Sequence, residues 1–145
     1  MRRRMQGTAL AVVLVLAAAG MALSSAVATS AALELAMAEQ GTARQRAFEA
    51  AEAGLGAALR ARAWTADGPW SAAGELVAGG EWQVEVRLAA AQVDPVMGAV
   101  EWHFEIESLG RLGAAAVTLA QGFRVAGALP GEPRLTWWRR ADAAP

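Results

Sequence analysis

The sequence predicts an α+β fold in which one long N-terminal helix packs on a small antiparallel β-sheet. Two observations predict the helix: residues 8–33 hold no charged side chain, and residues 34–63 are mostly strong helix formers without proline. A third predicts the sheet, because apolar and polar residues alternate in short runs after Gly80. We therefore expect an apolar half of the helix (8–33), an amphipathic half (34–63) with Gly41 as its softest point, and a β-rich head (64–145).

Composition restricts the function of this 145-residue chain. A formal net charge of −1 and a sequence pI near 5.8 give no basic surface of the kind that binds nucleic acid. The chain has no cysteine, which excludes a disulfide framework and a thiolate metal site. Phosphate-binding, zinc-protease and serine-hydrolase motifs are absent from the sequence, so we expect neither an enzyme nor a bound cofactor.

The apolar run predicts a membrane-directed segment. At ~1.5 Å per residue, a helix over residues 8–33 is longer than the ~30 Å hydrocarbon layer of a bilayer. Arginines occupy positions 2–4, and by the positive-inside rule they keep the N-terminus in the cytoplasm while the rest of the chain is translocated. Three interpretations fit: a single-pass anchor, a secretory signal cleaved near Ala28, or a leader cleaved after Gly7 that leaves the apolar helix attached.

The residues after the apolar run favour a helix that stays attached. Phe48, Ala51, Leu55 and Leu59 recur at helical spacing and form one apolar stripe, with arginines and glutamates on the other faces. A cut near Ala28 would separate this amphipathic segment from the apolar run although no linker lies between them. We therefore expect one continuous helix of about 55 residues, half in a membrane and half under a domain.

Four segments of the head have the pattern of strands. Residues 82–88 and 100–107 alternate apolar and polar side chains without a break. Residues 110–113 indicate a hairpin connection into a third strand at 117–125, and residues 135–138 form either a short edge strand or a tail. The resulting three or four antiparallel strands share one apolar face that needs a cover. The apolar stripe of the helix is expected to provide it.

Two groups of side chains in the head are candidate sites, and each has a plainer interpretation. His103 lies between Glu101 and Glu105 on one strand face, an arrangement suited to a metal or to acid–base chemistry, although charged strand faces are usually only solvated. Residues 137–140, Trp-Trp-Arg-Arg, combine types that dominate protein interfaces but equally suit an edge strand that blocks aggregation. We therefore expect no catalytic, metal-binding or cofactor-binding residue.

Three segments of the N-terminal third resemble the pilins of type IV pili. Residues 6–16, QGTALAVVLVL, resemble the leader junction of prepilins. Residues 29–38, TSAALELAMA, and the more specific block at 44–53, RQRAFEAAEA, resemble the PilX-type minor pilins. The resemblance extends over residues 2–60 and is thin in the head.

This resemblance implies a pilin-like fold and a role in pilus assembly or initiation. Residues 1–7 would be a prepilin leader, which the prepilin peptidase removes after Gly7 before methylating the new N-terminus at Thr8. The helix would sit in the lipid of the bacterial inner membrane as a single pass, then pack with other minor and major pilins and reach the pilus and cell surface. The small residues within 17–25 suit such close helix packing. A signal-anchored envelope protein with a small periplasmic binding head, and a pseudopilin of a type II secretion system, remain alternatives.

One residue departs from the pilin pattern in a way that bears on assembly. Most pilins carry glutamate at the fifth mature position, where it is thought to neutralise a neighbouring subunit's amino terminus, and here that position is Val12. A buried charge without a partner is costly, so a subunit without this glutamate suits a position where no partner amine needs pairing, such as the tip. Thr8 in place of the common phenylalanine is a lesser departure. We therefore expect a minor rather than a main repeated subunit.

Overall fold

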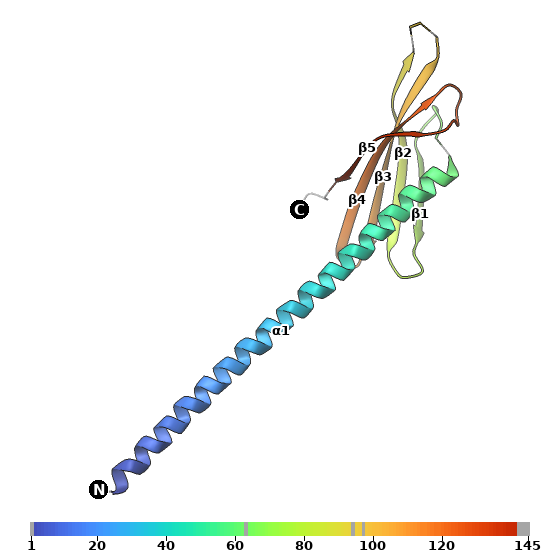
Figure 1. The fold of residues 1–145 in the computed structure, drawn as a ribbon. Helices are drawn as coiled ribbons and strands as arrows, with labels where there is room; N and C mark the ends of the chain where they lie inside the picture. Colours follow the sequence, from blue (N-terminus) through green and yellow to red (C-terminus); the bar gives the residue numbers. More distant parts are fainter. Residues whose placement is uncertain (1, 63, 94, 97, 142–145) are drawn as a thin grey trace. The chain divides into compact units, whose positions relative to one another are not determined.

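The computed structural model describes residues 2–62, 64–93, 95–96 and 98–141, with side chains from residue 10 onward. Helix α1 comprises Arg2–Ala61, and the strands are β1 (Trp70–Glu75), β2 (Glu81–Val93), β3 (Val100–Leu112), β4 (Ala115–Ala126) and β5 (Arg134–Ala141). The strands form one antiparallel sheet in the order β1-β2-β3-β4-β5 (Figure 1). The predicted α+β class, a long apolar N-terminal helix with an antiparallel sheet, is confirmed, but the sheet has five strands rather than three or four.

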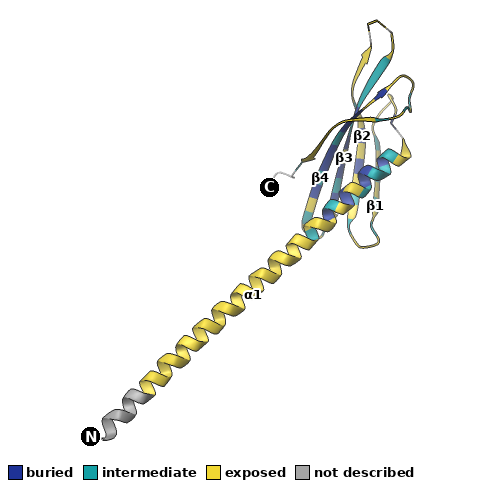
Figure 2. Ribbon diagram, in the orientation of Figure 1, coloured by how far each residue is buried: buried dark blue, intermediate teal, exposed yellow. Residues whose placement is uncertain are grey.

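The chain divides into two compact units between Gln40 and Gly41. The first unit contains the N-terminal part of α1, whose described side chains are all exposed. The second unit, called the head below, contains the rest of α1 and the whole sheet, and its helical segment is partly buried (Figure 2). Helix α1 continues without a break through Gly41, the residue at which the sequence predicts the helix to be least stable.

Helix α1 ends two residues before the predicted limit. Its last residue is Ala61, and Arg62 follows in the left-handed region with φ of 46°. The Arg62 N–H donates a hydrogen bond to the Ala58 carbonyl at 3.2 Å, an arrangement that satisfies one carbonyl at the helix C-terminus. Ala63, the predicted last residue, lies outside the described residues.

Half of the predicted stripe, Ala51 and Leu55, is buried in the contact between helix and sheet, together with further alanines. The fully buried helical residues are Ala47, Ala50, Ala51 and Ala58, whereas Phe48 and Leu59 are only partly buried. The reason lies in β3: a Cβ added at Gly110 would meet the main chain of Ala47 and Ala51. Because the helix backbone comes this close to β3 at Gly110, only small side chains fit there, whereas Leu55 is buried one turn further along the helix and Phe48 and Leu59 are only partly buried.

The apolar core lies between this helical segment and one face of the sheet. The sheet contributes alternate residues of β2, β3 and β4, namely Val84, Val86, Phe104, Ile106, Val117, Leu119, Phe123 and Val125. Trp64, just after the helix, is 1% exposed and meets the Phe123 ring edge-on at 4.9 Å between centroids. Phe123 in turn stacks on Phe104 at 5.4 Å. This aromatic group fixes the chain where it leaves the helix.

Two details of the strands differ from the sequence prediction. Strand β1 was not predicted, because apart from Trp70 its residues are small or polar and carry little strand signal. The turn between β3 and β4 is at residues 113–114 rather than 110–113, since Leu112 pairs with Ala115 and Gly113 has a positive φ of 57°. Gly110 belongs to β3, and because it has no side chain the backbone of α1 can approach the strand at this position. Residues 135–138 belong to an edge strand, β5, rather than to a tail.

Candidate functional site

The first unit presents an uncovered apolar surface. Its large apolar side chains are between 57% and 72% exposed: Leu10, Val12, Val13, Leu14, Val15, Leu16, Met21, Leu23, Val27, Leu33, Leu35 and Met37. By length and composition α1 can cross a membrane, a criterion that a signal sequence near an N-terminus also meets. An exposed apolar surface of this size is typical of a site of membrane or protein–protein interaction.

Three hydroxyl groups of this unit bond to carbonyl oxygens of the helix itself. Ser24 donates a hydrogen bond to the Gly20 carbonyl at 2.9 Å, and Ser25 to the Ala22 carbonyl at 2.9 Å. Thr29 donates to the Ser25 carbonyl at 2.8 Å. Each hydroxyl proton is therefore satisfied within the helix, as a lipid or helix-bundle environment requires.

The predicted processing and assembly residues are neighbours on this helix. Gly7 and Thr8 have helical backbone, and their side chains lie outside the described part. Val12 lies one helical turn beyond Thr8 and is 57% exposed. The three residues follow one another along the same helix, and their roles stay predictions.

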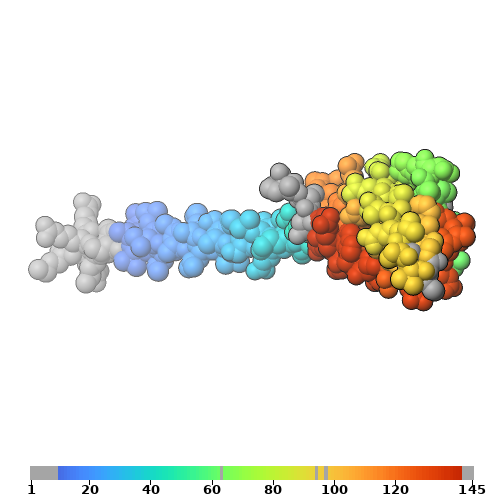
Figure 3. Space-filling model, turned by 90° about the horizontal axis from the view of Figure 1, so that it is seen from above, coloured from blue at the N-terminus to red at the C-terminus, as the bar shows by residue number. Residues whose placement is uncertain are grey.

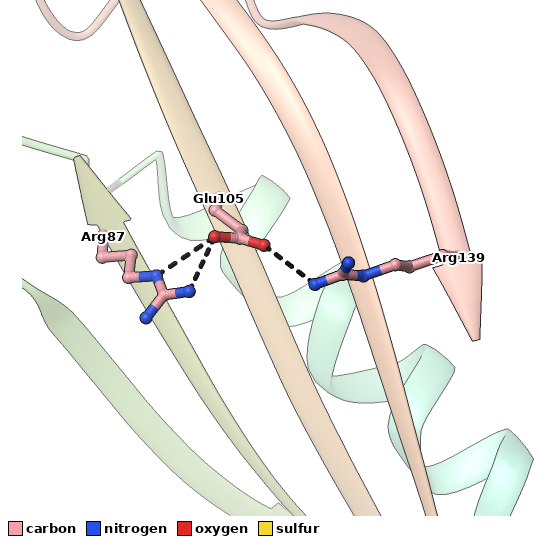
Figure 4. Close-up of polar contacts among 3 residues, drawn as sticks. All are labelled: Arg87, Glu105 and Arg139. Atoms are coloured by element: carbon pink, nitrogen blue, oxygen red, sulfur yellow. Dashed lines mark hydrogen bonds and ion pairs between the residues drawn. The ribbon is translucent and has the colours of Figure 1, made fainter. Parts of the chain in front are cut away.

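The outer face of the sheet, away from the helix, carries an ionic network centred on Glu105. The Arg87 Nη2 lies 2.7 Å and its Nε 3.2 Å from Glu105 Oε2, while the Arg139 Nη2 lies 3.6 Å from Oε1 (Figure 4). The hydrogen bond from Arg87 to Glu105, followed by the charge of Glu105, raises the pKa of the Arg87 guanidinium. The network joins β2, β3 and β5 and is a structural link rather than a reactive group.

The candidate group around His103 is not assembled as a metal or acid–base site. His103 Nε2 lies 3.2 Å from Glu101 Oε1, without hydrogen-bond geometry, and the same oxygen accepts a hydrogen bond from Arg124 Nη1 at 3.3 Å. Glu105, the second predicted neighbour, is engaged by two arginines. Within residues 2–62, 64–93, 95–96 and 98–141, three or more His, Asp or Glu side chains nowhere form a group that could hold a metal.

The Trp-Trp-Arg-Arg segment of β5 does not act as a single patch. Trp137 lies over Gly122, where a Cβ would meet its indole ring, and Arg139 lies 5.2 Å from the centre of that ring. Trp138 is 52% exposed and, by the register with Gln121, lies on the helix side of the sheet. Residues of β5, coloured red, form part of the surface of the head in Figure 3.

Charged residues are distributed unevenly across the sheet, a feature that was not predicted from the sequence. Strands β1, β2 and β3 contain six glutamates and two arginines, whereas β4 and β5 contain four arginines and no acidic residue. An open groove of about 500 Å³ lies on the acidic side, lined by Ser71, Ala72, Ala73, Gln83, Val84, Glu85, Glu107 and Leu109. Counting charges strand by strand would have revealed the asymmetry once the strand order was known.

No known protein family, curated protein or solved structure matches this chain. The functional interpretation therefore depends on the residues and their geometry.

Proposed function

We propose that the protein is a minor pilin-like subunit that acts in type IV pilus assembly or initiation without catalysing a reaction. One observation carries the proposal: an apolar helical segment whose described side chains are all exposed continues, within the same helix, into the segment that helps to form the core of the head. The prepilin-like junction at residues 6–16 and the blocks at 29–38 and 44–53 support it.

The apolar segment suits two successive environments. Burying a large aliphatic side chain is worth about 1.5–3 kcal/mol, so the exposed series on α1 favours lipid over water. The same surface can then pack against other pilin helices, and the run Ala17-Ala18-Ala19-Gly20 lets such helices approach closely. In this proposal the inner membrane holds the subunit, with its N-terminus cytoplasmic, until other minor and major pilins replace the lipid.

The continuity of the helix separates this proposal from a simple cleaved signal. Helix α1 continues through Ala28 without a turn. A secretory cut there would therefore remove the apolar half of the helix and leave the amphipathic half without a membrane-directed segment. Cleavage after Gly7 keeps the apolar half attached to the head. An anchored envelope protein with a binding head, or a type II secretion pseudopilin, would keep the same helix and is distinguished by processing and by incorporation into pili.

Replacing Gly7 with alanine tests the processing step. We expect intact-mass measurement of the wild-type protein to show a methylated N-terminus at Thr8, and Gly7→Ala to accumulate the uncut chain, because the leader glycine is the demanding position of the junction. Gly20→Ala is the matched control, since Gly20 lies in open space on the same helix and should not affect cleavage. A wild-type start at Met1 or Thr29, or a Gly7→Ala protein of mature wild-type mass, would contradict the proposal.

Replacing Val12 with glutamate tests the position in the pilus. A carboxylate at the fifth mature position would pair with a neighbour's amino terminus, so we expect Val12→Glu to raise the number of copies per pilus on the order of tenfold, equivalent to ~1.4 kcal/mol. Val13→Glu supplies the same charge on another face of the helix and should give no such gain. Quantitative immunolabelling of sheared pili measures the effect, and equal copy numbers for wild type and Val12→Glu would count against a tip position.

A further inference from the structure

We propose that the head makes a head-to-tail contact with a second copy of the chain, in which β5 of one copy is added to the β1 edge of the other. β1 and β5 are the two edge strands of the sheet. In the described part of the chain each pairs with a single neighbouring strand, β2 and β4 respectively, so its other edge offers main-chain N–H and C=O groups. This inference rests on the head alone and goes beyond the proposed function.

The charges of the two edges select a head-to-tail contact. The β5 side carries Arg124, Arg134, Arg139 and Arg140, and β1 and β2 carry Glu75, Glu81 and Glu85. A symmetric contact joining two β5 edges, or two β1 edges, would bring like charges together. A contact between β5 and β1 brings opposite charges together, as in interfaces with complementary potentials.

The head already contains an example of the side-chain arrangement that this contact needs. On the outer face, β4 presents small residues, Ala120 and Gly122, between β5 and β3. Across them, the edge-strand residue Arg139 reaches Glu105, two strands away, and Trp137 lies over Gly122. An arginine on an edge strand therefore reaches a glutamate two strands away when the strand between them is built from small residues.

The β1 edge repeats this arrangement without an arginine in place. Ser71 and Ala73 are the small residues of β1 on the outer face, and Ser71 is in register with Glu85 of β2. These residues line the open groove of about 500 Å³, together with Glu107 of β3. An arginine on a strand added beside β1 would cross Ser71 and reach Glu85, as Arg139 crosses β4 to reach Glu105.

Strand β5 also has the side chains to complete the contact. By register, Arg134 and Arg139 lie on the outer face, and the side chain of Arg139 is 65% exposed. On the helix side, Leu135 and Trp138 are 60% and 52% exposed, although both are large and apolar. When β5 is added to β1, these two side chains come beside the helix-side residue Trp70 of the second copy. Charged groups then meet on one face and apolar groups on the other.

Cross-linking between single-cysteine variants of the full chain tests the contact. The natural chain has no cysteine, so each introduced thiol is the only reactive one. Thr136→Cys labels β5 and Ala73→Cys labels β1, both at exposed positions. In detergent micelles with a short bismaleimide, we expect a dimer when the two variants are mixed and little dimer with either variant alone. A dimer formed mainly by Thr136→Cys alone or by Ala73→Cys alone, or no dimer at all, would overturn the proposal.

Charge reversal then separates this contact from packing between the membrane helices. We expect Arg134→Glu with Arg139→Glu in the β5-labelled copy to reduce cross-linking about tenfold, and Glu81→Arg with Glu85→Arg in the other copy to restore it. Arg111→Glu, an exposed arginine of β3, is the control and should change little. Cross-linking of the unreversed pair should also weaken in ~1 M salt, which checks the contact even if a reversed variant folds poorly.

Cross-linking that survives both reversal and salt would overturn the proposed contact. Leader cleavage after Gly7 is measured separately, by mass. A failure of the head-to-tail contact is therefore distinguishable from a failure of the proposed pilin role.

Discussion

The two parts of helix α1 show opposite relations between side-chain size and burial. In residues 10–40 the large aliphatic side chains, such as Leu14 at 63% and Leu16 at 66%, are exposed. In the head the same helix buries only small residues completely, among them Ala47, Ala51 and Ala58 at 0%. One continuous helix thus leaves its large apolar side chains exposed in the first unit, whereas in the head it buries mainly alanines, together with Leu55.

This difference shows that the apolar character of a side chain does not by itself determine whether the side chain is buried. Burial in the head is limited by space, because β3 approaches the helix backbone at Gly110 and leaves room only for alanine or glycine. Exposure in the first unit is not limited by space, and large side chains there offer contact area to lipid or to other helices. Substitutions that exchange size between the two parts therefore test the comparison directly.

The largest effect is expected from Gly110→Ala. The added Cβ would meet main-chain atoms of Ala47 and Ala51, which cannot rotate away as a side chain could, so the helix must move off the sheet. We expect the free energy of unfolding of the head to fall by at least ~3 kcal/mol, or the head not to fold. Urea unfolding followed by tryptophan fluorescence measures it, since all six tryptophans lie between residues 64 and 138.

Gly68→Ala is the matched control for this change. Gly68 is exposed, and a Cβ there has no neighbour within 4 Å, so its effect should stay within ~0.5 kcal/mol. The first part of α1 should remain helical in the Gly110→Ala protein, because its described side chains are all exposed. Unfolding of the two proteins at the same urea concentration would contradict the close approach of helix and sheet.

An intermediate effect is expected when one substitution is placed in both parts of the helix. Ala51→Leu adds three carbon atoms at a fully buried site and should destabilise the head by about 1–3 kcal/mol through overpacking. Ala36→Leu adds the same atoms at an exposed site of the first unit and should change the stability of the head by less than ~0.5 kcal/mol. If the two substitutions lowered the urea midpoint equally, the two parts of the helix would not differ in the space available to a side chain.

Much of the fold could be predicted from the sequence because its signals were local. The unbroken helix formers and the period-two runs at residues 82–88 and 100–107 required no knowledge of distant contacts. The face by which the helix docks could be predicted only in part. Ala51 and Leu55 of the predicted stripe are buried, but Phe48 and Leu59 are only partly buried, because a glycine in β3, distant in sequence, brings the helix closest to the sheet at Ala47 and Ala51.

Among the candidate surfaces, too, only those with a local signal could be predicted from the sequence. The apolar helix was evident from an uncharged run, so the sequence alone predicted a membrane-directed segment. The Glu105 network and the asymmetry of the sheet edges were not evident, because they depend on strand order and register: Arg87, Glu105 and Arg139 belong to three strands and meet only when β4 places small residues between β3 and β5. His103 illustrates the converse, since among the described residues its suggestive neighbour Glu105 is engaged by two arginines from other strands.

The smallest effect, and one of opposite sign, is expected from Ser108→Ala. The Ser108 hydroxyl lies under the helix beside Gly54, is 0% exposed and has no hydrogen-bond partner among the described residues. Removing a buried hydroxyl that makes no hydrogen bond relieves its desolvation cost, so we expect the head to gain about 1 kcal/mol. Ser24→Ala in the first unit is the control, because that hydroxyl already bonds to the Gly20 carbonyl and is exposed. A loss of stability in Ser108→Ala would mean that the hydroxyl has a hydrogen-bonded partner, such as a buried water. Water would then be present in the contact between helix and sheet, although alanines line this contact.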